Sequence, residues 1–157
     1  MPFELFMVSE TLEPVTVEGG MKVVPHYTFA DVPDCHVAVV GAQHGSPALQ
    51  DWLGKVAPSA DVLMSVCTGV NHLARAGLLN GKAATIHHDF YDRFARDNPK
   101  VDLRRGVRFV ENERISTSGG ESCGIDLSLR IVERYFGREV AQATAEYIEH
   151  QGQGWML

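Results

Sequence analysis

One short stretch in the middle of the chain constrains the fold more than any other feature. The apolar run Val62-Leu63-Met64-Ser65-Val66 enters a cysteine, and Cys67-Thr68-Gly69-Val70 then opens a helical pattern at once. A strand that bends sharply into a helix strains the residue at the bend, and small residues two positions away relieve the resulting clash. The spacing of Ser65, Cys67 and Gly69 therefore predicts a nucleophile elbow at the carboxyl end of a buried strand.

Strand and helix patterns alternate around this elbow. Strands are expected over residues 3–8, 36–40, 61–66 and 82–86, and hairpins over 15–24 and 107–117. Helices are expected from Pro47 with Ser46 as cap, over 70–76, after Asp89 as cap, and as two apolar stripes after residue 125. Such alternation predicts an α/β fold in which helices cover both faces of a mostly parallel sheet.

Size and charge narrow the function. The 157 residues predict one domain, 1–157, and 14 Lys and Arg against 20 Asp and Glu give a net charge of −6. An acidic chain lacks the basic face that nucleic acid requires, so no nucleic-acid partner is expected. No apolar run approaches the roughly 20 residues of a membrane span, and the first residues lack the pattern of a secretory signal. We expect a cytoplasmic protein with no membrane partner.

The three cysteines differ in their surroundings. Cys35, Cys67 and Cys123 lie 32 and 56 residues apart, a spacing that favours neither a disulfide framework nor a zinc site. At the elbow, the following helix should favour the Cys67 thiolate, and the Thr68 backbone N–H should face a developing oxyanion. The alternative is an inert, buried Cys67; Cys35 and Cys123 are expected to be structural.

Two segments resemble one known family. The residues SVCTGVNHLARAGLLNGKAATIH at 65–87 and STSGGESCGID at 116–126 resemble the DJ-1/PfpI superfamily, and the likeness extends over about 3–155. The resemblance implies a flavodoxin-like three-layer sandwich, usually a homodimer. Thr68 directly after the cysteine is most similar to the isonitrile hydratase branch, whereas protease-like members have histidine there, so a peptidase is disfavoured.

The resemblance also implies site residues. Cys67 would be the nucleophile, Thr68 an assisting hydroxyl and oxyanion donor, and His87 a pocket residue. Ala42 and Gln43 stand where the family usually has glycines, and their backbone N–H groups would complete the oxyanion hole.

The strand–helix unit that usually opens the family's domain has no counterpart in this sequence. That unit carries a carboxylate beside the cysteine, and general acid–base help is worth about 10²–10⁴-fold in rate. Glu121 and Asp126 are candidate substitutes, although acidic residues near a helix start more often act as caps. The gap in the sheet should be closed by direct re-pairing of strands or by a second copy, in a homodimer with strand complementation.

Two functions follow as hypotheses. The first is a cysteine-dependent enzyme that acts on a small molecule, such as an isonitrile that passes through a thioimidate to an N-substituted formamide. The second is a non-catalytic sensor of an oxidant or ligand, or a remnant without its catalytic acid. No cofactor is expected. No metal is expected either, because His87 and His88 as neighbours on a strand would point to opposite faces.

Overall fold

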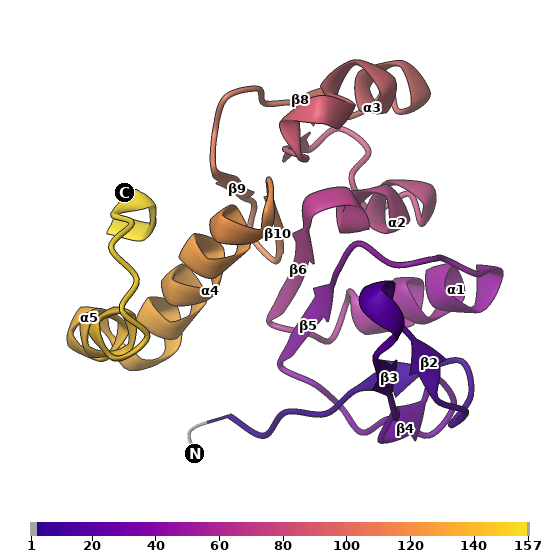
Figure 1. Ribbon diagram of the computed structural model, residues 1–157. Helices are drawn as coiled ribbons and strands as arrows, with labels where there is room; N and C mark the ends of the chain where they lie inside the picture. The colour runs from indigo at the N-terminus through magenta and orange to yellow at the C-terminus, as the bar shows by residue number, and fades with distance from the viewer. Residues whose placement is uncertain (1–2, 157) are drawn as a thin grey trace.

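A four-stranded sheet lies at the centre of the computed structural model, which describes residues 3–156 (Figure 1). Its order is β5–β6–β10–β9, with bounds Val37–Val40, Val62–Val66, Ile115–Ser118 and Phe109–Glu111. The first three strands are parallel, and β9 pairs antiparallel with β10. The predicted mostly parallel α/β sheet is confirmed.

Helices cover both faces of this sheet (Figure 1). On one face lie α1 (Pro47–Val56) and α2 (Val70–Arg75), and on the other lies α4 (Glu121–Phe136), against which α5 (Arg138–Tyr147) packs. Alternate residues of β6 serve the two faces, because successive strand side chains point in opposite directions. Leu63 packs in the core under α1 and α2, whereas Met64 packs under α4.

The remaining strands are short and lie outside this sheet. β1 (Val8–Ser9) pairs parallel with β4 (Tyr27–Thr28), β2 (Val15–Thr16) antiparallel with β3 (Lys22–Val23), and β7 (Ala83–Ala84) parallel with β8 (Asp102–Leu103). The hairpins expected at 15–24 and 107–117 are confirmed. The strand expected over 3–8 is wrong before Val8, because Leu5 is exposed and the ring of Phe3 packs on Tyr135 instead.

Local signals place the helix ends well and the helix faces less well. The Ser46 hydroxyl accepts a hydrogen bond from the Leu49 N–H at 3.2 Å, so the predicted cap of α1 is confirmed. On α4 the predicted apolar stripe is only partly buried, since Leu129 is enclosed but Ile125 is 41% exposed. A short helix, α3 (Tyr91–Asp97), follows β7.

An open apolar hollow lies beside α4. Its volume is about 380 Å³, and its lining includes Val39, Met64, Ile125 and Val132. Within the described residues β5 is the outer strand of the sheet, and Val39 is 61% exposed. No helix among residues 3–156 is long and apolar enough to span a membrane.

Candidate active site

The bend after β6 has the strained backbone that the sequence predicts. Cys67 has φ +56°, and a 3₁₀ turn over Cys67–Gly69 leads directly into α2. Such a φ is unfavourable for a residue with a side chain, so the surrounding packing must hold it. Gly69 shows how tight that packing is, because an added Cβ would meet the Val40 carbonyl oxygen and lie 2.8 Å from that of Gly41.

Three neighbouring strands end close to Cys67. The ladder pairs each β5 residue with the β6 residue 25 positions later, and it ends with Val40 opposite Ser65, two residues before Cys67. On the other side, the Cys67 N–H donates a hydrogen bond of 2.7 Å to the Gly119 carbonyl. The cysteine therefore lies at the carboxyl edge of the parallel strands, where open α/β sheets bind ligands.

The Cys67 thiol is nearly enclosed, with 8% of the residue exposed. Burial raises the pKa of this thiol, and the negative charge of Glu121 raises it further. Hydrogen bonds from the Thr68 backbone N–H and hydroxyl act in the opposite sense and are outweighed. Burial and the charge of Glu121 therefore oppose the thiolate that the start of the helix was expected to favour.

A cavity of about 160 Å³ adjoins the elbow on its α2 side. Thr68 lines it, and the Asn71 side chain donates a hydrogen bond of 2.9 Å to the Thr68 carbonyl. The other lining residues come from α2 and the segment 86–97 and include two arginines and two phenylalanines: Arg75, Ile86, Phe90, Arg93, Phe94 and Asp97. A small molecule in this cavity would touch Thr68, the residue after the cysteine, although Cys67 itself is not among the lining residues.

The loop after β10 brings His87 and Glu121 to the same place. A Cβ on Gly120 would lie 3.1 Å from the ring of His87, while the preceding Gly119 bonds Cys67. Glu121 follows directly as the first residue of α4. The predicted Asp89 cap is wrong, because the His87 ring nitrogen accepts the Asp89 N–H at 3.3 Å instead.

The other candidate acid is bound elsewhere. The Asp126 carboxylate is fully buried and accepts hydrogen bonds from Arg108 Nε and, at 2.8 Å, from His150 Nε2. Both of its oxygens are engaged, so Asp126 is not available as the substitute acid, and Glu121 is the candidate that remains.

Ala42 and Gln43 lie in the loop between β5 and α1, as expected for a loop that follows a parallel strand. The Gln43 carbonyl accepts a hydrogen bond of 2.9 Å from Nε2 of His72 on α2. No sequence pattern pairs these two residues, because 29 positions separate them. One signal was present: His72 lies one helical turn beyond the elbow.

The reason given against a metal at His87 and His88 is also wrong. Both residues precede α3, where a 3₁₀ turn spans His88–Phe90, and their rings stack 4.3 Å apart. With Asp89 they bring three ligand atoms within 4.8 Å of one another. His88 and Asp89 are exposed, and surface groups of this kind are common without an ion, so the trio alone supports no metal assignment.

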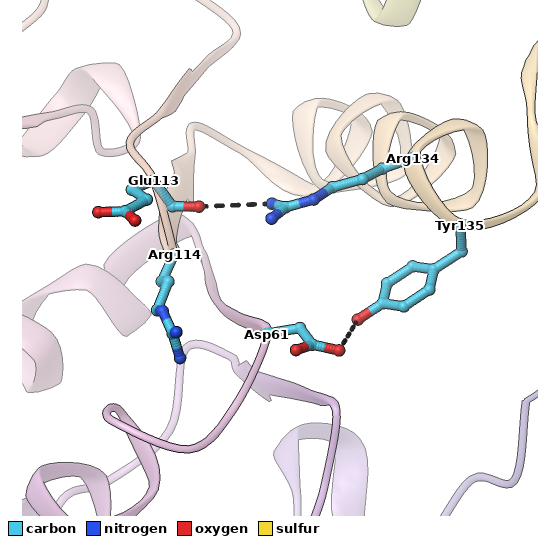
Figure 2. Close-up of a pocket in the computed structure, with 5 residues that line it drawn as sticks. All are labelled: Asp61, Glu113, Arg114, Arg134 and Tyr135. Carbon is cyan, nitrogen blue, oxygen red and sulfur yellow. Dashed lines mark hydrogen bonds between the residues drawn. The ribbon is translucent and has the colours of Figure 1, made fainter.

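Another cavity, of about 270 Å³, lies at the opposite edge of the sheet (Figure 2). There the Tyr135 hydroxyl donates a hydrogen bond of 2.8 Å to Asp61, which precedes β6. Burial and this bond raise the pKa of Tyr135 to about 12. The Arg134 guanidinium donates to the Glu113 carbonyl at 3.5 Å, as Figure 2 shows. These contacts fasten α4 to the amino ends of β6 and β10, so we interpret them as structural.

Relatives of the chain include enzymes and regulators. The chain is 32% identical to isonitrile hydratase of Pseudomonas putida over 155 residues, or 94% of this chain and 66% of that protein. It is 33% identical to the HTH-type transcriptional regulator CdhR of Pseudomonas aeruginosa over 101 residues, 64% of this chain and 30% of the regulator. Because such regulators are among the relatives, the exclusion of nucleic acid from charge alone was too broad.

Solved structures and a family model agree with this grouping. A THiJ/PfpI family protein from Pseudomonas syringae superposes with a TM-score of 0.79 at 25% identity, covering 96% of this chain and 64% of that one. The chain therefore spans about two thirds of the hydratase and of this neighbour, and less of the regulator. The model of the DJ-1/PfpI family matches residues 2–134. The chain belongs to the DJ-1/PfpI family.

Proposed function

We propose that the chain is a cysteine-dependent enzyme that acts on a small electrophile, with Cys67 as nucleophile. The observation that carries the proposal is the positive φ of Cys67 at the carboxyl edge of the sheet, where its N–H bonds the Gly119 carbonyl just after β10. A fold maintains such strain where the surroundings over-determine it, and these places cluster at active sites. The cavity beside Thr68 is a suitable seat for the substrate.

An isonitrile is the substrate we infer, from the similarity to isonitrile hydratase. The Cys67 sulfur attacks the terminal carbon, and the thiol proton passes to that carbon through Glu121, which gives a thioimidate. Water then adds to the same carbon, and the C–S bond breaks to release the N-substituted formamide and restore the thiol. The oxygen charge that develops in this second half is stabilised by the backbone N–H groups of Ala42, Gln43 and Thr68.

Because the pKa of Cys67 is raised, the attack needs a proton acceptor. We assign this role to Glu121, the first residue of α4, whose charge acts on the thiol. His87 packs against Gly120, in the loop that leads to Glu121, and we assign it to contact with the substrate.

The test is turnover of cyclohexyl isocyanide, followed by mass spectrometry of the formamide. We expect the wild-type chain to form it and Cys67→Ser to lose at least about 100-fold in rate, as nucleophile removal does in other enzymes. Cys35→Ser and Cys123→Ser are the matched controls and should keep full activity. Formamide produced equally well by Cys67→Ser would refute the proposal that Cys67 is the nucleophile of an enzyme.

A second candidate is a ligand sensor, favoured by the likeness to CdhR and by the burial of the thiol. In that case a ligand seated beside Thr68 binds without turnover. Isothermal calorimetry with the isocyanide would then give saturable binding in both wild type and Cys67→Ser, and no formamide.

We also propose a homodimer in which a second copy covers β5 and the apolar hollow beside it. The support is the open edge of β5 and the exposed Val39, since proteins seldom leave a long apolar edge uncovered. Light scattering at micromolar concentration should give a dimer for the wild type and a monomer for Val39→Lys. A wild-type monomer that melts cooperatively would contradict this assembly.

A further inference from the structure

A buried histidine supports the loop that passes beside the elbow. His72 lies on α2 and is 3% exposed, and its ring reaches across to the segment between β5 and α1. The Nε2 atom lies 2.9 Å from the Gln43 carbonyl oxygen. A carbonyl oxygen can only accept, so Nε2 carries the hydrogen and donates it. Nδ1 is enclosed and has no hydrogen-bond partner among the described residues.

The same ring also fills the space next to Gly45. A Cβ at that position would lie 2.6 Å from His72 Nδ1, too close for any larger residue without movement of the ring. The loop therefore bends around the imidazole, with its middle hydrogen-bonded at Gln43 and its end packed at Gly45. At its beginning, the carbonyl of Gly41 lies against Gly69.

Little else fixes this segment. Outside the helices and strands of residues 3–156, residues 42–45 take part in no backbone–backbone hydrogen bond. The strand ladder ends with Val40 opposite Ser65, so strand pairing does not extend to the loop. The side chain of His72 thus holds the peptide group that joins Gln43 to His44 through the Gln43 carbonyl.

We propose that His72 is a positioning residue: by anchoring the Gln43 carbonyl it fixes the course of the loop, so that the N–H groups of Ala42 and Gln43 in the two preceding peptide groups face the oxygen that becomes charged during reaction at Cys67. This inference rests on the proposed function, because it assigns the loop the oxyanion role. His72 itself touches neither the substrate nor the reacting atoms. The use of glycine at position 45 follows from the same arrangement, since the ring needs that space.

Two reagents that attack the same sulfur test the proposal. p-Nitrophenyl acetate acylates a thiol through an oxyanion: the S–C bond forms, nitrophenolate leaves and the thiol proton passes to solvent. Iodoacetamide alkylates the thiol by direct displacement of iodide, with no oxyanion. The measurement is the ratio of the two rates at Cys67, each followed by peptide mass spectrometry. A change in stability or access alters both rates together and leaves the ratio unchanged.

The variants separate donation from packing. We expect His72→Leu to lower the ratio at least about tenfold, less than the 10²–10³ lost when an oxyanion donor itself is removed. His72→Gln places an amide donor near the position of Nε2 and should keep the ratio within about threefold of wild type. Should His72→Leu fail to fold, His72→Asn serves instead, because its shorter amide does not reach Gln43.

Each outcome decides the matter. A ratio that stays at the wild-type value in His72→Leu, or that falls as far in His72→Gln as in His72→Leu, overturns the positioning role while Cys67 remains the nucleophile. A Cys67 that reacts with neither reagent faster than Cys35 overturns the proposed function and this inference together.

Discussion

At Cys67 two demands oppose each other. The bend that aims the side chain at the sheet edge also encloses it, and burial disfavours the charged sulfur. Thr68 partly offsets this effect through its N–H and hydroxyl, while Glu121 adds to it. A protonated thiol resists stray oxidation, since the thiolate is the reactive form.

The Thr68 hydroxyl should be measurable through the reactivity of its neighbour. Thr68→Val keeps the backbone N–H and the side-chain shape but removes the hydroxyl that lowers the Cys67 pKa. The pKa should rise further, so alkylation by iodoacetamide at pH 7.5 should slow by about threefold or more. At a pH high enough to ionise the thiol in both proteins, the rates should approach each other. Equal rates at pH 7.5 would count against the hydroxyl contact.

Glu121 should affect alkylation and turnover in opposite directions. Glu121→Gln removes a negative charge that raises the Cys67 pKa, so alkylation near pH 8 should become about two- to fivefold faster, and 0.5 M salt should reduce the difference. Isocyanide turnover should fall, because the proton acceptor is lost. Glu18→Gln, on the peripheral 3₁₀ turn, is the control and should change neither rate. Slower alkylation in Glu121→Gln would refute the electrostatic assignment.

Among the elements, Gly69 carries the tightest constraint. Gly69→Ala would press a methyl group on the carbonyls of Val40 and Gly41, which are backbone and cannot move aside. We expect a loss of about 3 kcal/mol in the free energy of unfolding, measured by urea denaturation. Gly54→Ala in α1 is the matched control, since nothing lies within 4 Å of its new Cβ, and it should stabilise by about 0.5–1 kcal/mol. Similar changes in the free energy of unfolding for the two variants would contradict the close approach of Gly69 to the Val40 and Gly41 carbonyls.

Elements that depend on local pattern could be predicted from the sequence, and contacts between distant residues could not. The strand into Cys67, the cap at Ser46 and the 107–117 hairpin each have a signal within a few residues. Residues 3–7 have a strand pattern but no neighbouring strand to complete it. The placement of His88 on a strand is wrong, because β7 has only two residues and ends before it, and His88 begins a 3₁₀ turn. The contact of His72 with Gln43 exists only after α2 folds beside β5.

At the scale of the whole molecule, the C-terminal segment is held against α4 by a hydrogen bond to a buried carboxylate and by a tryptophan. Glu149 has φ +55° and turns the chain after α5, which brings His150 to the Asp126 carboxylate. Trp155 is fully buried against Leu129 of α4. Arg108, just before β9, donates to the same carboxylate, so one buried charge joins three distant segments.

Removal of one partner from this cluster should therefore be costly. Arg108→Ala leaves the Asp126 carboxylate buried with only His150 beside it, and we expect a loss of about 3 kcal/mol in the free energy of unfolding. Arg104→Ala removes an arginine whose pair with Asp102 is exposed, and it should cost less than about 1 kcal/mol. Guanidinium denaturation of the two variants makes the comparison. If Arg108→Ala lowers the free energy of unfolding no more than Arg104→Ala does, the stabilising role of Arg108 at the buried Asp126 carboxylate is contradicted.

The pairing of β5 with β6 has a consequence for how this chain tolerates insertions and deletions. Deletion of Val39 would move Val40 from the core to the outward-facing position that Val39 now holds, because side chains alternate along a strand. The same deletion would bring Gln43 to the level that Ala42 now occupies. Folding and chemistry would fail in one step, so changes in substrate range at this edge have to arise by amino-acid replacement and not by changes in strand length.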